Sequence, residues 1–168
     1  MSEPEEGLTR RAAQVLDACR ARAWRLATAE SCTGGMIAAG LTAIAGSSDV
    51  VERGFVTYSN AAKTELLGVP ADLIALVGAV SEQVARAMAA GALAHSPATL
   101  SAAITGIAGP DGGTPAKPVG TVHLAAARRD GRMLHEHRLF PGNRDAVRQA
   151  SALAAMDLLI QLLSSGPP

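Results

Sequence analysis

The chain has 168 residues, of which 48% are apolar, and this is enough for one domain with an ordinary hydrophobic core. Its 15 basic and 15 acidic residues cancel to zero net charge, and its aromatic residues are one Trp, one Tyr and two Phe. Proteins that bind nucleic acid typically carry a basic excess for the phosphates or many aromatic rings for the bases, so we expect no nucleic-acid partner.

The sequence gives no sign of export or membrane insertion. Cys19 and Cys32 do not form a disulfide or zinc-binding pattern. There is no signal peptide, and no uninterrupted apolar run approaches the roughly 20 residues that a membrane helix needs. We therefore expect a cytoplasmic protein with no membrane partner, built as a single domain over residues 1–168.

The first part of the chain alternates helical and strand patterns. After a polar start, apolar residues at helical spacing predict a helix over about 8–22. A short strand over 24–29 runs into the glycine-containing turn 30–35, and a helix of small residues follows over 36–45. Strand, turn and helix in this order place a helix amino terminus where a ligand can bind.

The rest of the chain continues this alternation and ends in a hairpin and a long helix. Asp130 and Gly131 are a standard hairpin signal, so the two strands around them should be antiparallel. The predicted elements are, in chain order, a strand over 50–59, a short helix capped by Asn60, an apolar turn at 73–77, a helix over 81–95, a buried strand over 99–107, an irregular loop at 109–118, strands over 120–127 and 133–140, and a helix over 143–163.

Strands joined by helices pair in parallel, and the hairpin adds one antiparallel strand. The sequence therefore predicts an α/β protein, a three-layer α/β/α sandwich around a mixed, mostly parallel sheet of about five strands. The last helix is apolar on more than one face. This favours a subunit interface and burial inside the monomer equally.

Ser31 is the first candidate for chemistry, because it follows a strand and precedes a helix at the ligand-binding edge of such a sheet. The backbone N–H groups that follow it could stabilise an oxyanion if Ser31 attacked a carbonyl group. The plainer interpretation is that Ser31 or Thr33 only caps the helix. Gly34 and Gly35 favour the first interpretation, since glycines at a helix start cost stability and suggest close approach of the backbone to a ligand.

Cys32 is an alternative nucleophile, since a helix start lowers the pKa of a thiol. However, none of the four histidines lies in a recognisable partner motif, and free cysteines are usually small buried residues.

Tyr58 and Lys63 lie just past the second strand. A lysine in a helical turn is usually a solvated surface charge, but a desolvated lysine can lose its proton and act as a general base. Spacing does not show that Lys63 meets Ser31. Both residues nevertheless follow strand carboxyl ends, and Ser–Lys pairs are a known form of activated nucleophile.

A third candidate region runs from Thr105 into the glycine-rich loop, whose N–H groups could bind phosphate or carboxylate. It matches neither the Walker nor the dinucleotide fingerprint, and a plain long loop is the alternative. Arg144 and Arg148, at the start of the last helix, oppose the helix dipole. A bound anion would explain them, as would surface solubility.

Taken together, these segments resemble the CinA carboxy-terminal domain family over about residues 8–163. The segments that carry the resemblance are 29–35 (AESCTGG), Tyr58-Ser59-Asn60 with Lys63, 105–110 (TGIAGP), Gly112-Gly113, 117–120 (KPVG), and Gly142-Asn143-Arg144 with Arg148. Longer CinA proteins carry a further amino-terminal domain, and the chain resembles the stand-alone form.

The resemblance implies a fold related to anticodon-binding domains, a homo-oligomer, and hydrolysis of nicotinamide mononucleotide to nicotinate mononucleotide and ammonia, with no metal and no cofactor. It assigns Ser31 as the nucleophile, Lys63 as its base and Tyr58 as a residue that assists or positions them. The residues that it offers for the oxyanion are Thr33, Gly34 and Gly35, and those for the substrate are Thr105, Gly106, Gly109, Gly112, Gly113 and Arg144.

Two other functions stay open at this point. One is a non-catalytic nucleotide-binding or regulatory module linked to competence or the DNA damage response, because a fold does not fix a function. The other is the same chemistry on a different amide.

Overall fold

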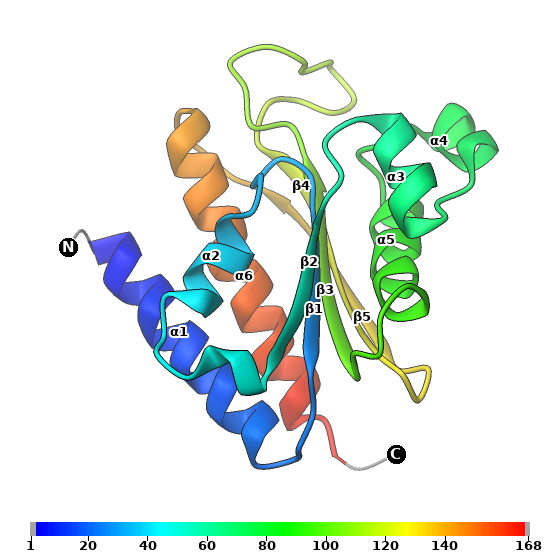
Figure 1. Cartoon of the computed structure of the whole chain (residues 1–168). Coiled ribbons are helices and arrows are strands. Elements are labelled where there is room, and N and C mark those ends of the chain that lie inside the picture. Colours follow the sequence, from blue (N-terminus) through cyan, green and yellow to red (C-terminus); the bar gives the residue numbers. More distant parts are fainter. Residues whose placement is uncertain (1–2, 167–168) are drawn as a thin grey trace.

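A five-stranded sheet divides the molecule into three layers (Figure 1). The computed structural model describes residues 3–166, and within them the strands lie in the order β2-β1-β3-β4-β5. The strands are β1 (Leu26–Glu30), β2 (Val51–Val56), β3 (Leu100–Gly106), β4 (Thr121–Arg128) and β5 (Met133–Leu139). The predicted α/β class, with its sheet of about five strands, is confirmed.

The direction of each strand follows from the connection before it. β1 pairs in parallel with β2 and with β3, while β4 is antiparallel to both β3 and β5. Within residues 3–166, β4 therefore runs against the other four strands, as expected for a mostly parallel sheet with one antiparallel strand. A loop without a helix joins β3 to β4, whereas parallel neighbours are usually joined by a helical crossover.

The helices form the two outer layers, as Figure 1 shows. One face of the sheet carries α1 (Glu3–Arg20), α2 (Met36–Thr42) and α6 (Arg144–Ser164), and the other carries α3 (Asn60–Leu67), α4 (Ala71–Val77) and α5 (Glu82–Ala94). Successive residues of a strand face opposite layers. Leu124 of β4 accordingly packs with the α1 and α6 side chains, and its neighbour Ala125 packs with those of α5.

Burial within the molecule explains the apolar character of α6. By length and composition α6 would be able to cross a membrane, but half of its apolar window is buried inside the structure. It lies against α1 on one side and the sheet on the other, with Met156 and Leu159 fully buried. The composition of α6 is thus no longer an argument for a subunit interface, and the homo-oligomer stays a prediction.

Two helices differ from their sequence-based expectations. α1 begins at Glu3 rather than near residue 8, because Pro4 and the surrounding glutamates suit the first turn of a helix. The apolar turn expected at 73–77 is the helix α4, which begins after Pro70 and is too short to show a clear helical period.

A close contact between α3 and α5 fixes the position of α3. A Cβ atom on Gly91 of α5 would lie only 2.0 Å from the carbonyl oxygen of Leu67, at the end of α3. Only glycine allows this approach of two backbones, and α3 carries Lys63.

We therefore expect Gly91→Ala to lower the free energy of unfolding by about 2 kcal/mol, because α3 must shift to relieve the overlap. Urea denaturation measures this loss. Gly7→Ala is the matched control, since Gly7 is also helical but a Cβ there would meet nothing closer than 3.4 Å. That variant should unfold at the same or a slightly higher urea concentration. Equal midpoints for Gly91→Ala and the unmodified protein would show that the contact does not hold α3 in place.

Candidate active site

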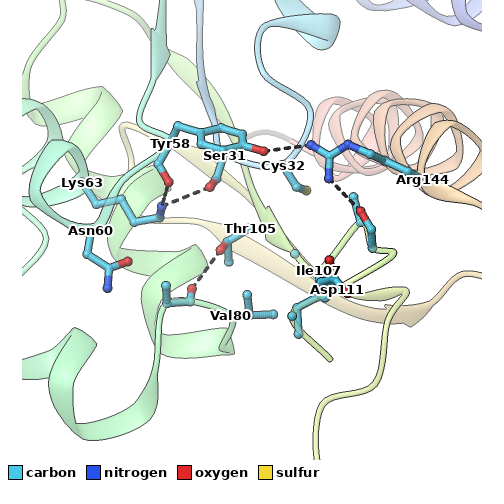
Figure 2. Close-up of a pocket in the computed structure, with 15 residues that line it drawn as sticks. Ser31, Cys32, Tyr58, Asn60, Lys63, Val80, Thr105, Ile107, Asp111 and Arg144 are labelled. Atoms are coloured by element: carbon cyan, nitrogen blue, oxygen red, sulfur yellow. Dashed lines mark hydrogen bonds between the residues drawn. The ribbon is translucent and has the colours of Figure 1, made fainter. Parts of the chain in front are cut away.

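The candidate site lies at the edge of the sheet where β1, β2 and β3 end. Because these strands are parallel, the segments that follow them meet at one edge. They enclose a cavity of about 280 Å³, and Figure 2 shows its side chains. Ser31 comes from the end of β1, Lys63 from α3 after β2, and Thr105 from the end of β3.

Ser31 and Lys63 are in direct contact. The Nζ atom of Lys63 lies 3.0 Å from Oγ of Ser31, and the two side chains point toward one another in Figure 2. Lys63 is only 1% exposed and Ser31 8%. Burial lowers the pKa of the Lys63 amine, since the charged form loses its hydration. Within residues 3–166, no carboxylate forms an ion pair with this amine.

The Lys63 amine has two carbonyl neighbours besides Ser31 Oγ. Its Nζ lies 2.8 Å from the carbonyl oxygen of Thr57 and 3.4 Å from that of Tyr58. A neutral amine has two N–H donors and one lone pair. When the amine is neutral and its two donors go to these carbonyls, the lone pair is left for the Ser31 hydroxyl, the arrangement that a general base needs.

A buried carboxylate organises the loop after β1. Glu30 is fully buried, and its oxygens accept hydrogen bonds from the Thr33 hydroxyl at 2.6 Å and from the N–H groups of Ile37 at 2.9 Å and Ala38 at 3.0 Å. These two N–H groups belong to the first turn of α2. The amino terminus of α2 is therefore occupied by Glu30, and a substrate oxyanion must be held by the loop itself.

The predicted oxyanion donors are only partly available. The Gly34 N–H donates to the carbonyl of Ser31 at 3.0 Å, so the expectation that Gly34 is a free donor was wrong. The N–H groups of Cys32, Thr33 and Gly35 donate to no carbonyl oxygen among residues 3–166. Cys32 lines the cavity directly after Ser31, whereas Thr33, which is fully buried, and Gly35 are absent from the cavity wall in the described part of the chain.

Arg148 of α6 contacts this loop, besides the Asp145 carboxylate 4.0 Å from its Nη1. Its Nε donates to the carbonyl of Cys32 at 3.2 Å, and its Nη2 donates to the carbonyl of Thr33 at 3.1 Å. Both donors are thus used on backbone acceptors. The sequence motif contained Arg148, but its spacing gave no sign of this contact.

Arg144 bridges two sides of the cavity mouth. Its Nη2 donates to the hydroxyl of Tyr58 at 2.9 Å, and its Nη1 donates to the carbonyl of Gly109 at 2.9 Å. Figure 2 shows the Tyr58 ring reaching from the Ser31 side toward Arg144. Both side chains are exposed, so they are accessible to a ligand that enters the cavity.

The cavity contains most of the residues predicted to bind substrate. Those in its wall are Thr105, Gly106, Gly109, Gly112 and Arg144. The Thr105 hydroxyl donates to the carbonyl of Ala79 at 2.9 Å and so helps to position the neighbouring loop. Gly113 is absent from the described wall, and a Cβ there would lie 2.8 Å from the Val119 nitrogen, so it serves loop packing instead.

Asn60 and Asp111 also line the cavity, although sequence reasoning did not select them as site residues. Asn60 was expected to cap its helix. In the structure Ser59 is the cap, with its hydroxyl accepting from the Ala62 N–H at 3.0 Å, and Asn60 is the first helical residue. The signal for its role was available only as part of the family motif.

Cys32 lies beside the nucleophile but is not suited to attack. Burial raises the pKa of its thiol to about 11, and the side chain is 5% exposed. The thiolate is therefore scarce near neutral pH, which favours Ser31 as the nucleophile. Among residues 3–166, no group of three or more potential metal-ligating side chains is arranged to hold a metal ion.

A mixed α/β sandwich with a buried Ser–Lys pair at the ends of its parallel strands defines a hydrolase-like site. A model of the CinA C-terminal domain matches residues 8–163, and the chain belongs to this family.

Two relatives share most of their length with the chain. It is 55% identical over 139 residues to the nicotinamide-nucleotide amidohydrolase PncC of Pseudomonas putida, and the matched region covers 82% of the chain and 86% of that protein. It is 47% identical to PncC of Enterobacter agglomerans, over 94% of the chain and 96% of that protein. A solved structure, the competence/damage inducible protein CihA from Agrobacterium tumefaciens, superposes with a TM-score of 0.91 at 46% identity, covering 93% of the chain and 95% of that structure.

Other relatives are longer. A CinA-like protein of Mycolicibacterium gilvum is 60% identical over 141 residues, which are 84% of the chain but 33% of that protein. The chain thus spans about a third of the length of such relatives.

We expect the Cys32 thiol to resist alkylation by iodoacetamide at pH 8 in the folded protein, because burial both hides it and raises its pKa. Cys19, whose pKa burial raises to about 12, is the internal control and should be equally slow. Both should react readily in urea, as mass spectrometry would show. Rapid labelling of Cys32 alone would reopen its candidacy as the nucleophile.

Proposed function

We propose that the protein hydrolyses the carboxamide of nicotinamide mononucleotide to nicotinate mononucleotide and ammonia, a reaction of pyridine nucleotide salvage. The observation that carries the proposal is the 3.0 Å contact between Ser31 Oγ and the buried Lys63 Nζ, whose pKa is lowered. The names of the relatives that match most of the chain support the choice of amide.

The reaction begins with acyl transfer to Ser31. Lys63, neutral at the start, takes the hydroxyl proton as Ser31 Oγ attacks the carboxamide carbon. The negative charge that forms on the carbonyl oxygen is held by the N–H group of Cys32, which lines the cavity and has no carbonyl acceptor among residues 3–166. Lys63 then gives its proton to the departing nitrogen, the C–N bond breaks, and ammonia leaves.

Water completes the reaction. It attacks the acyl-enzyme ester while Lys63 takes one of its protons, and the second tetrahedral intermediate collapses. The ester C–O bond breaks, Ser31 recovers its proton from Lys63, and the carboxylate product is released.

Arg144 and Tyr58 recognise the rest of the substrate in this proposal. Arg144 is exposed at the mouth of the cavity and carries the positive charge that a phosphate needs. The Tyr58 ring offers an aromatic face for the pyridinium cation, and its backbone carbonyl helps to orient Lys63. Thr105 and the glycines at 106, 109 and 112 shape the opposite wall.

A purely non-catalytic module explains the site less well. Burying a lysine without a carboxylate partner costs stability, and nucleotide binding alone does not require it. A general base does require a lysine that loses its proton easily.

Purified protein should release ammonia from nicotinamide mononucleotide, and neither free nicotinamide nor glutamine should replace it. Nicotinamide riboside, which lacks the phosphate, should be a poor substrate because Arg144 then has no anion to bind.

Ser31→Ala should lower kcat by about a thousandfold or more and keep nucleotide binding. Lys63→Arg should also be inactive, since arginine does not deprotonate. Full activity of Ser31→Ala, or no turnover of the mononucleotide by unmodified protein, would contradict the proposal. Assays with added chelator exclude a contribution from contaminating metal ions.

The pH profile reports the state of Lys63. A base works only when unprotonated, so kcat/KM should rise with pH and level off above the pKa of Lys63. Because burial lowers that pKa, the midpoint should fall below the ordinary lysine value of 10.5. Stopped assays across the pH range, with circular dichroism to confirm folding, measure the profile. A rate that falls as pH rises would be inconsistent with a neutral Lys63 as the base.

A further inference from the structure

Arg148 makes contacts that neither nucleotide binding nor proton transfer explains. It lies on the second turn of α6, is absent from the described cavity wall, and directs two donors to consecutive carbonyls of the loop that follows Ser31. We propose that Arg148 is a positioning residue that holds the loop carrying the Cys32 N–H, the oxyanion donor in the cavity wall, in place beside Ser31. The inference rests on the proposed acyl transfer at Ser31.

The geometry of the peptide bond carries the first step. In a trans peptide the C=O of one residue and the N–H of the next point in opposite directions. Arg148 holds the Cys32 carbonyl at 3.2 Å, so the Thr33 N–H points away from α6. Arg148 holds the Thr33 carbonyl at 3.1 Å, and the Gly34 N–H on the other side of that peptide reaches the Ser31 carbonyl. Arg148 therefore fixes the Cys32 and Thr33 carbonyls of the turn that closes on Ser31, and with them the backbone that carries the Cys32 N–H.

The loop needs such a restraint. Gly34 and Gly35 follow with φ angles of +59° and +103°. Glycine adopts positive and negative φ angles about equally readily, so these two residues do not by themselves fix the backbone. Glu30 fixes the loop from the α2 side through the Thr33 hydroxyl at 2.6 Å. Without Arg148, no described side chain would hold the Cys32 and Thr33 carbonyls, which follow the Cys32 N–H in the turn.

The charge of Arg148 strengthens this restraint. Hydrogen bonds from an ionised donor are stronger than those from a neutral one, so the guanidinium holds the two carbonyls more firmly than a neutral side chain would. Arg148 is absent from the described cavity wall, so its charge is not placed beside Lys63.

Arg148→Met removes both contacts and keeps most of the apolar stem. We expect it to lower kcat by roughly ten- to a hundredfold, since loss of one oxyanion donor typically costs more than this and repositioning costs part of it. KM should change by less than about twofold, because the N–H groups act on the transition state rather than on the bound amide. Arg148→Lys, which reaches one carbonyl, should restore part of kcat.

Arg11→Met is the matched control. The Arg11 side chain, on α1, is 27% exposed, against 28% for the Arg148 side chain. Arg11 bonds to Asp157 of α6, the helix that carries Arg148, away from the cavity. It should leave kcat unchanged. To test binding separately, nicotinamide mononucleotide is titrated calorimetrically into Ser31→Ala and into Ser31→Ala with Arg148→Met, and equal Kd values are expected.

A second substrate separates this inference from the proposed function. The activated ester p-nitrophenyl acetate acylates a reactive serine: the Ser31 oxygen bonds to the acetyl carbon, Lys63 takes the hydroxyl proton, and nitrophenolate leaves. The nitrophenolate burst needs the same oxyanion donors whatever the natural amide is. Arg148→Met should slow this burst tenfold or more, with Ser31→Ala as the blank. If the mononucleotide is not turned over but the burst still depends on Arg148, the inference holds and the proposed substrate fails.

Three results would overturn the inference. Retention of both rates within twofold by Arg148→Met would make the two carbonyl contacts irrelevant to catalysis. A rise in its Kd for the mononucleotide in step with the loss of kcat would make Arg148 a phosphate ligand. Failure of the unmodified protein to react with either substrate would remove the activated serine on which the positioning role depends.

Discussion

Removal of the Lys63 amine from water is the constraint on which the site depends. A lysine buried to 1% exposure without a carboxylate partner among residues 3–166 is costly, and the surrounding fold must hold it there. α3 is pressed against α5 through the Gly91 contact, and the carbonyls of Thr57 and Tyr58 accept its hydrogens. The cost is offset by two hydrophobic cores, one on each face of the sheet.

The fold was predictable because local periodicity and connection rules agree in this chain. Asp130-Gly131 fixed the β4–β5 hairpin, and crossover helices fixed the parallel pairs. The order β2-β1-β3-β4-β5 was not predictable, since any strand order consistent with short connections satisfies the same pattern. α4 was missed because seven residues give fewer than two helical repeats.

The site was predictable only in part. The sheet-edge rule placed Ser31 and Lys63 at the same edge, and the resemblance to the CinA family assigned their roles. Their contact depends on side-chain direction, which spacing does not encode. The same limit applies to Arg148, which contacts a carbonyl 116 residues away along the chain. Gly34 was misassigned because a turn that closes on the Ser31 carbonyl cannot be distinguished in sequence from one that leaves the N–H free.

Glu30, Lys63 and Arg148, three of the charged residues of the motif, bond to different partners around the loop that follows β1. Glu30 ends the strand with its side chain on the α2 side, where three donors hold its carboxylate, while Lys63 approaches Ser31 from the α3 side. A carboxylate within hydrogen-bond reach of Lys63 would restore its proton and remove the base. Arg148 in turn is held by loop carbonyls on the α6 side. Glu30 and Arg148 are thus held by partners other than Lys63, and the buried amine keeps no carboxylate partner among residues 3–166.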